Sequence, residues 1–374
     1  MREIRILHTA DLHLDCLLGG LPYERRVERR AEIFAGLRRV VQLAGDHRVD
    51  ALLVVGDLFD LDCLSRETVA QVSALFRSAG LPILLVPGNH DPGEDPRSPY
   101  REDVFPPNCH VFGGDEFTAF SPVEGLTVHG LPFLAAARRR RQLRDFARRF
   151  PPTPGEGFRV VAHHGAYSGF TLPEGDYAPV LPQDLVDTQA HYVALGHHHN
   201  WRDVTPRGGP PACYPGSPVR LDWSNLPERK ALLVRFKPGA PAAEVEPLVL
   251  EDRPYLEIEF NPATAPLEDL IAELEAVADE QAMVRVVLEG TVPGDGLVHP
   301  DRLEAAYRGR FFHLKVEDRT RPAPSDRPQS TITGLFLARL AQRLEGLPED
   351  APDREALNLA TKYGLAALRG EDLR

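Results

Sequence analysis

Short apolar runs alternate with longer amphipathic segments through the first half of the chain. The apolar runs occupy 4–9, 51–55, 82–86, 111–112, 126–129, 158–162 and 192–195. Between the first two, 23–44 carries apolar residues along one side, which predicts a helix. Ser65 is a candidate N-cap for a second helix, with Thr68 as its fourth residue. Because continuous apolar strands separated by helices favour a buried sheet, we expect an α/β fold.

The pattern changes near 237–243, where Pro, Gly and Ala cluster. After this point the chain predicts strands and helices in turn at 255–260, 267–278, 284–288, 302–307 and 311–316. These elements indicate a small α+β domain, followed by a Pro-rich linker at 321–328. Two amphipathic segments, 331–344 and 354–368, close the chain. We therefore expect three parts, at 1–240, 253–320 and 329–370.

Composition adds limits to this picture. A chain of 374 residues is expected to form more than one folding unit. No apolar run approaches the roughly 18–20 residues needed to span a bilayer, and no signal peptide is evident. The four cysteines form no CxxC pair, which argues against a structural zinc site and favours a reduced, cytoplasmic setting. The net charge of −12 argues against nucleic-acid binding over the whole surface, but it leaves room for a local basic footprint.

Five polar motifs follow the apolar runs. In chain order they are Asp11-Leu-His13, Gly56-Asp57-Leu-Phe-Asp60, Gly88-Asn89-His90-Asp91, His163-His164-Gly165 and Gly196-His197-His198-His199. Ligand sites in open α/β sheets form at the carboxyl ends of the strands, so this placement is a functional signal.

The residue types in these motifs suit divalent metal ions. Carboxylate, amide and imidazole groups are ligands of hard and borderline cations such as Mn²⁺. Alternate residues of an extended chain point the same way, so Asp11 and His13 can reach one ion. Asp57 can bridge two ions through its two oxygens, and such a pair can clamp a phosphate and lower the pKa of a water. His90 is not needed as a ligand and is free to act as a general acid.

Each motif alone has an ordinary explanation. Asp-x-His occurs often on surfaces, Gly-Asp can mark a strand-to-turn transition, and Gly-Asn-His-Asp can be a loop. A His-rich triplet can bind metal adventitiously. All five motifs in this order, each after a strand, favour one shared two-metal site.

The ordered set resembles the calcineurin-like metallophosphoesterase superfamily over residues 1 to 235. That resemblance implies a two-sheet sandwich flanked by helices. It assigns one metal to Asp11, His13, Asp57 and His199, and the other to Asp57, Asn89, His163 and His197. His163 is preferred over His164 because relatives place the ligand two residues before a Gly or Asn. His90 would be the catalytic histidine.

Within the superfamily, the opening residues and the second and third motifs are similar to the SbcD type of DNA repair exonuclease. The order of a phosphoesterase domain, a small capping domain and C-terminal helices fits that type. Many relatives carry a His where this chain has Asp60, so we expect Asp60 to orient His90 or a water. The resemblance also implies DNA as substrate, an SbcC-like or AAA-type ATPase as partner, and a homodimer. The absence of a long apolar run predicts no membrane association.

The basic stretch and the two C-terminal segments can each be interpreted in two ways. The basic stretch at 138–149 could track a phosphate backbone, or it could be an exposed helix face offset by nearby acids. The apolar faces of 331–344 and 354–368 could bind a partner, or they could pack on their own chain.

The leading hypothesis is a Mn²⁺-dependent DNA exonuclease or endonuclease that acts in DNA repair. Its rivals are a phosphodiesterase or phosphatase on nucleotides and other small phosphoesters, and a metal-bearing regulatory subunit of an ATPase. The C-terminal helices argue against the small-molecule enzyme, which needs no docking helices. The complete ligand set argues against the regulatory subunit.

Overall fold

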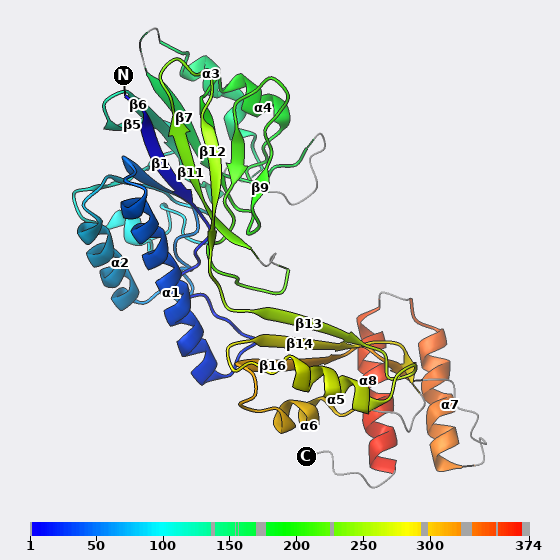
Figure 1. Cartoon of the computed structure of the whole chain (residues 1–374). Coiled ribbons are helices and arrows are strands. Elements are labelled where there is room, and N and C mark those ends of the chain that lie inside the picture. The colour runs from blue at the N-terminus through cyan, green and yellow to red at the C-terminus, as the bar shows by residue number, and fades with distance from the viewer. Residues whose placement is uncertain are drawn as a thin grey trace. The chain divides into compact units, whose positions relative to one another are not determined.

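The computed structural model describes residues 2–135, 139–153, 155, 157–169, 177–224, 228–292, 298–322, 331–348 and 351–368. The chain divides into two compact units, Met1–Asp252 and Arg253–Arg374, which are coloured blue to green and yellow to red in Figure 1. The first unit holds all five polar motifs.

Two six-stranded sheets form the centre of the first unit. The first sheet has the order β12 (Glu244–Leu250), β11 (Arg229–Phe236), β1 (Ile4–Thr9), β2 (Ala51–Val55), β3 (Ile83–Val86) and β4 (Cys109–Val111). The second has the order β5 (Thr118–Val123), β6 (Leu126–Leu131), β7 (Phe158–His164), β8 (Tyr192–Gly196), β10 (Ala212–Tyr214) and β9 (Arg202–Asp203). An apolar core drawn from both sheets lies between them, so the predicted two-sheet sandwich is confirmed.

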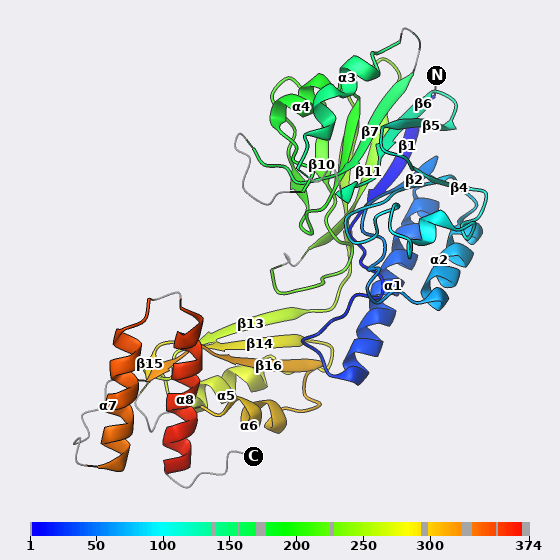
Figure 2. The same cartoon turned by 180° about the vertical axis from the view of Figure 1, so that it is seen from behind.

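Helices cover both outer faces of this sandwich. α1 (Tyr23–Asp46) and α2 (Arg66–Ala79) pack on the first sheet through a second apolar core. The short helices α3 (Phe146–Arg149) and α4 (Pro182–Asp187) lie over the second sheet, as Figure 2 shows from behind. The predicted cap of α2 is confirmed, since the Ser65 hydroxyl accepts the Thr68 N–H at 3.1 Å.

Strand direction decides where the polar motifs meet. The strands β1, β2, β3 and β4 run parallel to one another, as do β6, β7 and β8 in the other sheet. Their carboxyl ends therefore lie at one edge of each sheet, which is where a ligand site is expected in such a fold.

One side of the first sheet is formed by two strands that the apolar pattern did not predict. β11 pairs antiparallel with β1, and β12 pairs antiparallel with β11. Because β12 begins at Glu244, the first unit extends past residue 240 to Asp252.

The second unit is built on three parallel strands. These are β13 (Tyr255–Phe260), β14 (Met283–Leu288) and β16 (His313–Asp318). The helices are α5 (Leu267–Ala276), α6 (Pro300–Ala306), α7 (Ile332–Glu345) and α8 (Pro352–Leu368). A short pair, β15 (Thr291–Val292) and β17 (Arg321–Pro322), completes the described strands. The two C-terminal helices thus belong to the same compact unit as the small α+β fold.

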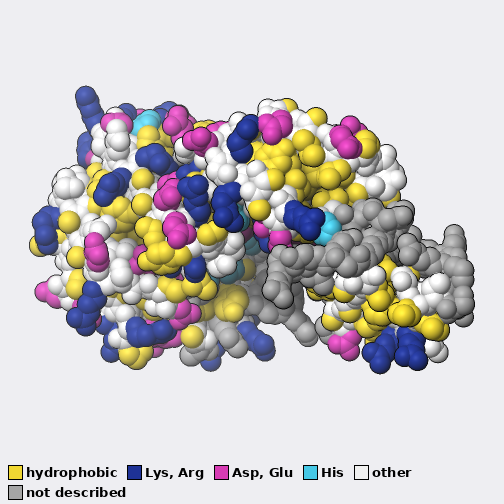
Figure 3. Space-filling model, turned by 90° about the horizontal axis from the view of Figure 1, so that it is seen from below, with side chains coloured by type: hydrophobic (Ala, Val, Ile, Leu, Met, Phe, Trp, Pro, Cys, Tyr) yellow, Lys and Arg dark blue, Asp and Glu magenta, His cyan; other side chains and the backbone are white. Residues whose placement is uncertain are grey.

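The C-terminal helices pack on one another and leave apolar side chains exposed. A Cβ added to Gly364 of α8 would overlap the Phe336 ring of α7, so these helices are in close contact. Ile332 and Leu335 of α7, by contrast, are 76% and 51% exposed. Hydrophobic side chains beside Lys and Arg are visible in the right half of Figure 3. Packing within the chain is therefore confirmed for part of the apolar face, and partner binding by the exposed part stays a prediction.

No helix within the described ranges has both the length and the apolar character that crossing a membrane would require.

A buried histidine between the sheets makes the stability of the fold depend on pH. His8 is fully buried, and its Nδ1 lies 2.8 Å from the Tyr192 hydroxyl. Burial lowers the pKa of His8 to about 3, below the value near 6.5 in an unfolded chain. Since the unfolded chain binds the proton first, the stabilising contribution is present above pH 6.5 and is lost as the pH falls towards 3.

We expect this one group to lower the free energy of unfolding by about 2 kcal/mol between pH 7 and pH 5. Urea unfolding of the wild type and of His8→Leu, measured at both pH values, tests the difference. The variant should lose about that much of the pH dependence, whatever its stability at pH 7. An unchanged dependence would mean that His8 is not held neutral.

Candidate metal centre

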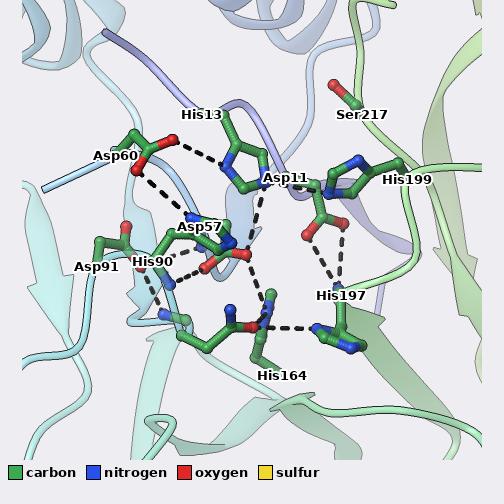
Figure 4. Close-up of polar contacts among 12 residues, drawn as sticks. Asp11, His13, Asp57, Asp60, His90, Asp91, His164, His197, His199 and Ser217 are labelled. Atoms are coloured by element: carbon green, nitrogen blue, oxygen red, sulfur yellow. Dashed lines mark hydrogen bonds and ion pairs between the residues drawn. The ribbon is translucent and has the colours of Figure 1, made fainter. Parts of the chain in front are cut away.

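Residues from five strand ends converge at one place in the first unit (Figure 4). Asp11 and His13 follow β1, Asp57 follows β2, and Asn89 and His90 follow β3. On the other sheet, His164 ends β7, while His197 and His199 follow β8. Each motif is thus placed by the carboxyl end of a buried parallel strand.

The backbone is strained where the strands deliver these side chains. Asp11, His13 and Asp57 have φ values of 56°, 49° and 50°, and His197 has a φ of 116°. Residues other than glycine seldom adopt positive φ, and such residues cluster at functional sites. The strain therefore points to a functional arrangement.

Asp57 lies between two groups of donor atoms. Its Oδ2 is 3.6 Å from His13 Nε2 and 3.3 Å from His164 Nε2. Its Oδ1 accepts the His90 N–H at 2.8 Å. One carboxylate therefore faces imidazoles from both sheets.

The remaining donors sort into two sets around Asp57. In the first, His13 Nε2 and His199 Nε2 are 3.1 Å apart, and a carboxylate oxygen of Asp11 lies within 4.8 Å of a ring nitrogen of each histidine. In the second, Asn89 Oδ1 lies 3.0 Å from His164 Nε2 and 3.0 Å from His197 Nδ1. Carboxylate, amide and imidazole donors at these separations fit divalent metal ions.

Burial keeps several imidazoles in their neutral, metal-binding form. It lowers the pKa of His13 to about 4 and that of His197 to about 3. Burial also raises the pKa of Asp11 to about 7, which means that the positive charge near this carboxyl does not offset the cost of ionising it inside the protein. A cation held by these side chains would supply that charge.

His164 is the exception among the site histidines. Burial works against its charged form, but the Asp57 carboxylate outweighs burial and raises the pKa of His164 to about 9. Burial likewise opposes ionisation of Asp57, yet His164 holds the pKa of this carboxyl well below its usual range. Without metal, the two residues form a buried ion pair at the centre of the site.

The preference for His163 as a ligand needs correction. Side chains alternate along β7, and His164 lies on the same face as Ala162 and Val160 in the core between the sheets. His163 points to the opposite face, where its ring lies 6.2 Å from that of Phe117. The structure thus brings His164, not His163, to the other predicted ligands.

Asp91 has a positioning role that the sequence did not single out. It is fully buried, and its two oxygens accept N–H groups from Asp57, Phe59 and Gly88. It also accepts the hydroxyl of Tyr100 at 2.7 Å. Asp91 therefore fixes the loop of Asn89 against the loop of Asp57. Asp91 is the last residue of the Gly88-Asn89-His90-Asp91 motif, but the sequence of that motif does not tell a carboxylate that positions the loop from one that binds metal.

The backbone of His199 is positioned by Arg229, a residue that the sequence analysis did not single out. The buried Arg229 donates from Nη1 to the His199 carbonyl at 2.8 Å, and the Ser217 N–H bonds to the same oxygen at 3.0 Å. Arg229 lies on β11, a strand that the apolar pattern did not predict.

The proposed acid pair lies beside the first donor set. His90 Nδ1 is 3.4 Å from Asp60 Oδ1, and the other oxygen of Asp60 is 3.9 Å from His13 Nδ1. The hydrogen bond with Asp60 raises the pKa of His90. The His90 side chain is 46% exposed, so it can meet a substrate. This geometry fits an orienting role for Asp60.

The basic stretch has acidic partners along part of its length. Arg141 pairs with Asp184 at 2.6 Å, and Arg149 pairs with Glu116 at 2.8 Å. Arg138 lies outside the described residues. These pairs favour the reading of an exposed face offset by acids.

Gly88 offers a test of how tightly Asp57 must be held. A Cβ at Gly88 would overlap the carboxylate and the backbone nitrogen of Asp57. We expect Gly88→Ala to weaken Mn²⁺ binding roughly 10- to 100-fold, as loss of supporting contacts does in other metal sites. Isothermal titration with Mn²⁺ measures the effect.

Gly93→Ala is the matched control on the same loop. Its Cβ would meet nothing closer than Pro87 Cγ at 3.5 Å, an ordinary contact. The control should bind Mn²⁺ like the wild type. Equal binding by both variants would show that the Asp57 carboxylate tolerates displacement.

Comparison with known proteins agrees with this geometry. The model of the calcineurin-like phosphoesterase family matches residues 4–201. The uncharacterized metallophosphoesterase YhaO of Bacillus subtilis is 28% identical over 309 residues, covering 78% of this chain and 73% of that protein. The DNA double-strand break repair protein Mre11 of Aeropyrum pernix is 28% identical over 316 residues, covering 77% and 74%. A component of the SbcCD nuclease of Bacillus subtilis is 25% identical over 349 residues, covering 83% and 85%.

The family model spans the motifs from Asp11 to His199. The resemblance drawn from those motifs is therefore confirmed. This chain belongs to the calcineurin-like phosphoesterase family.

Proposed function

We propose that the chain hydrolyses phosphodiester bonds of DNA at a site that holds two divalent ions, with Mn²⁺ as the working metal. The observation that carries the proposal is the position of Asp57, whose Oδ2 faces His13 from one side and His164 from the other. The similarity to a DNA repair protein and to a component of a nuclease supports DNA as the substrate.

The chain's own residues would divide the work. Asp11, His13, Asp57 and His199 would hold one ion, and Asp57, Asn89, His164 and His197 the other. When bound, the ions would neutralise phosphate charge and lower the pKa of a water molecule. His90 would donate a proton to the leaving oxygen, with Asp60 holding its ring through Nδ1.

The C-terminal helices suggest an ATPase as partner. One relative is named as a component of the SbcCD nuclease, and this chain covers 85% of its length. The exposed Ile332 and Leu335 of α7 and Tyr363 of α8 offer an apolar surface for such a partner.

Cleavage of single- and double-stranded DNA, compared with hydrolysis of methyl p-nitrophenyl phosphate, tests the function. Both reactions are run with the purified chain in Mn²⁺ and after removal of metal with EDTA. DNA cleavage that requires Mn²⁺ would support the nuclease. Hydrolysis of the small ester without DNA cleavage, with or without an ATPase partner, would point to a small-molecule phosphodiesterase.

A further inference from the structure

The loop between β3 and β4 returns to the metal centre through one side chain. After Asp91 the chain runs through residues 92–108 before it enters β4, and Tyr100 lies within this loop in a short 3₁₀ helix, Pro99–Arg101. The Tyr100 hydroxyl donates to Asp91 Oδ2 at 2.7 Å. Every ligand of the candidate metal centre lies outside residues 92–108, so Tyr100 can act on the centre only through another residue.

The Tyr100 hydroxyl is one of four donors that hold the carboxylate of Asp91. Asp91 Oδ1 accepts the N–H groups of Asp57 at 3.1 Å and of Gly88 at 2.7 Å, and Oδ2 accepts the N–H of Phe59 at 3.1 Å. This carboxylate lies beside Asp57 in Figure 4. Because Asp91 has no exposed surface, bulk water would not replace a missing donor, and the orientation of the carboxylate depends on all four.

The orientation of Asp91 matters because the backbone of Asp57 is strained. Asp57 has a φ of 50°, and a strained conformation persists only where the surroundings over-determine it. Asp91 does this by accepting the N–H groups of both Asp57 and Phe59. The Asp57 carboxylate in turn lies 3.6 Å from His13 Nε2 and 3.3 Å from His164 Nε2. A rotation of Asp91 would therefore release the segment that places this carboxylate.

Tyr100 is itself held so that its hydroxyl is a fixed donor. Its ring stacks on that of Phe105, with the ring centroids 5.6 Å apart and the planes 19° apart, and its centroid is 6.1 Å from that of Phe59. Burial raises the pKa of Tyr100 well above its usual value, and the charge of Asp91 raises it further, so the hydroxyl keeps its proton. A hydrogen bond to a carboxylate is about twice as strong as one between neutral groups.

We propose that Tyr100 is a positioning residue of the metal centre, which acts through Asp91 to hold the Asp57 carboxylate between the two donor sets. The proposal rests on the proposed function, because it takes those donor sets to bind Mn²⁺. It differs from a purely structural role in a measurable way. A residue that only anchored the loop would change the stability of the fold and leave the affinity for Mn²⁺ unaltered.

Tyr100→Phe tests the role, because it removes the hydroxyl and keeps the ring that stacks on Phe105. We expect Mn²⁺ to bind roughly 10-fold more weakly in isothermal titration calorimetry, at the low end of what loss of supporting contacts costs at other metal sites. DNA cleavage should need a correspondingly higher Mn²⁺ concentration to reach half of its maximal rate. At saturating Mn²⁺ the rate should return close to that of the wild type, since every ligand is still present.

Ser73→Ala is the matched control for the same loop. The Ser73 hydroxyl, on α2, donates to the Val104 carbonyl at 2.6 Å, so the variant loosens the loop but keeps all four donors of Asp91. Ser73→Ala should bind Mn²⁺ like the wild type, whatever its melting temperature. Circular dichroism melting in EDTA reports the stability of each variant without metal.

A double-mutant cycle with Asp91→Asn shows whether the two residues act as one unit. Asp91→Asn should itself weaken Mn²⁺ binding, since an amide cannot accept N–H groups at both of its ends. Adding Tyr100→Phe to Asp91→Asn should then weaken binding no further, because the effects of residues in one network are not additive. If Asp91→Asn does not fold, the comparison of Tyr100→Phe with Ser73→Ala decides.

The outcomes separate this role from the proposed function. Wild-type affinity for Mn²⁺ in Tyr100→Phe, an equal loss in Ser73→Ala, or a full additional loss in the double variant would overturn the role of Tyr100 alone. A wild-type chain that binds no Mn²⁺ would overturn the two-ion site and this role with it. Mn²⁺ binding that weakens in Tyr100→Phe, in a chain that cuts no DNA, would overturn the nuclease and leave the role of Tyr100 standing.

Discussion

Replacing Asp57 with Asn should reduce phosphodiester hydrolysis about 10³-fold or more in saturating Mn²⁺. The carboxylate lies between the two donor sets, so the variant would lose the negative charge that faces both of them and one of the two oxygens. Metal ions at such sites supply several kcal/mol of transition-state stabilisation, and each 1.36 kcal/mol is a factor of ten in rate. Turnover of DNA and of methyl p-nitrophenyl phosphate should fall together, because the loss affects the phosphate and not the leaving group.

The variant should still fold. Asn keeps the shape of the side chain, and His164 can release its proton once the carboxylate that raises its pKa is gone. We therefore expect a cooperative melting transition in circular dichroism, together with weaker Mn²⁺ binding by calorimetry. Asp62→Asn is the matched control, since this carboxylate is 83% exposed on the same loop. Wild-type turnover by Asp57→Asn would remove the basis for a bridging carboxylate.

The strands that deliver the site could be predicted because they are buried on both faces. β2 and β8 are apolar throughout; Asp57 comes after Gly56 at the end of β2, and His197 comes after Gly196, the last residue of β8. A strand covered by a sheet on one side and helices on the other has no polar face, so it appears in the sequence as a continuous apolar run.

Other strands lack this signature for physical reasons. β12 alternates exposed and partly buried residues at the edge of its sheet, and β5 is an edge strand that contains Pro122. β11 begins with Arg229 and Lys230 and carries Arg235 before its last residue, and its inner position is set by pairing with β1, a contact between distant parts of the chain. The hydrophobic pattern within a short stretch of sequence cannot predict such long-range pairing.

The same limit explains the choice between His163 and His164. Both histidines end an apolar strand, so the sequence shows that one of them reaches the metal centre. Which one does so depends on which face of β7 meets the other sheet, and both faces of β7 are buried. A shift of one residue exchanges the two faces of a strand, and only the packed structure settles it.

Replacing His90 with Asn should slow DNA cleavage roughly 10²- to 10⁴-fold, the usual contribution of a positioned general acid. The loss should depend on the leaving group. The deoxyribose oxygen that leaves DNA is strongly basic and needs a proton, whereas p-nitrophenolate leaves readily without one. Hydrolysis of methyl p-nitrophenyl phosphate by the variant should therefore fall less than about 10-fold on the same reasoning. Steady-state rates for both substrates in Mn²⁺ measure this contrast.

Two companion variants separate proton donation from support of the site. Asp60→Asn keeps the His90 ring but removes the carboxylate bonded to its Nδ1 at 3.4 Å, so it should show the same contrast at a smaller size. His47→Asn, at the end of α1 and before the amino end of β2, whereas the site lies at the carboxyl end of that strand, should change neither rate. Equal losses on both substrates would mean that His90 maintains the metal centre and gives no proton to the leaving group. The contrast between leaving groups thus decides what His90 does, because damage to the metal centre slows both reactions alike.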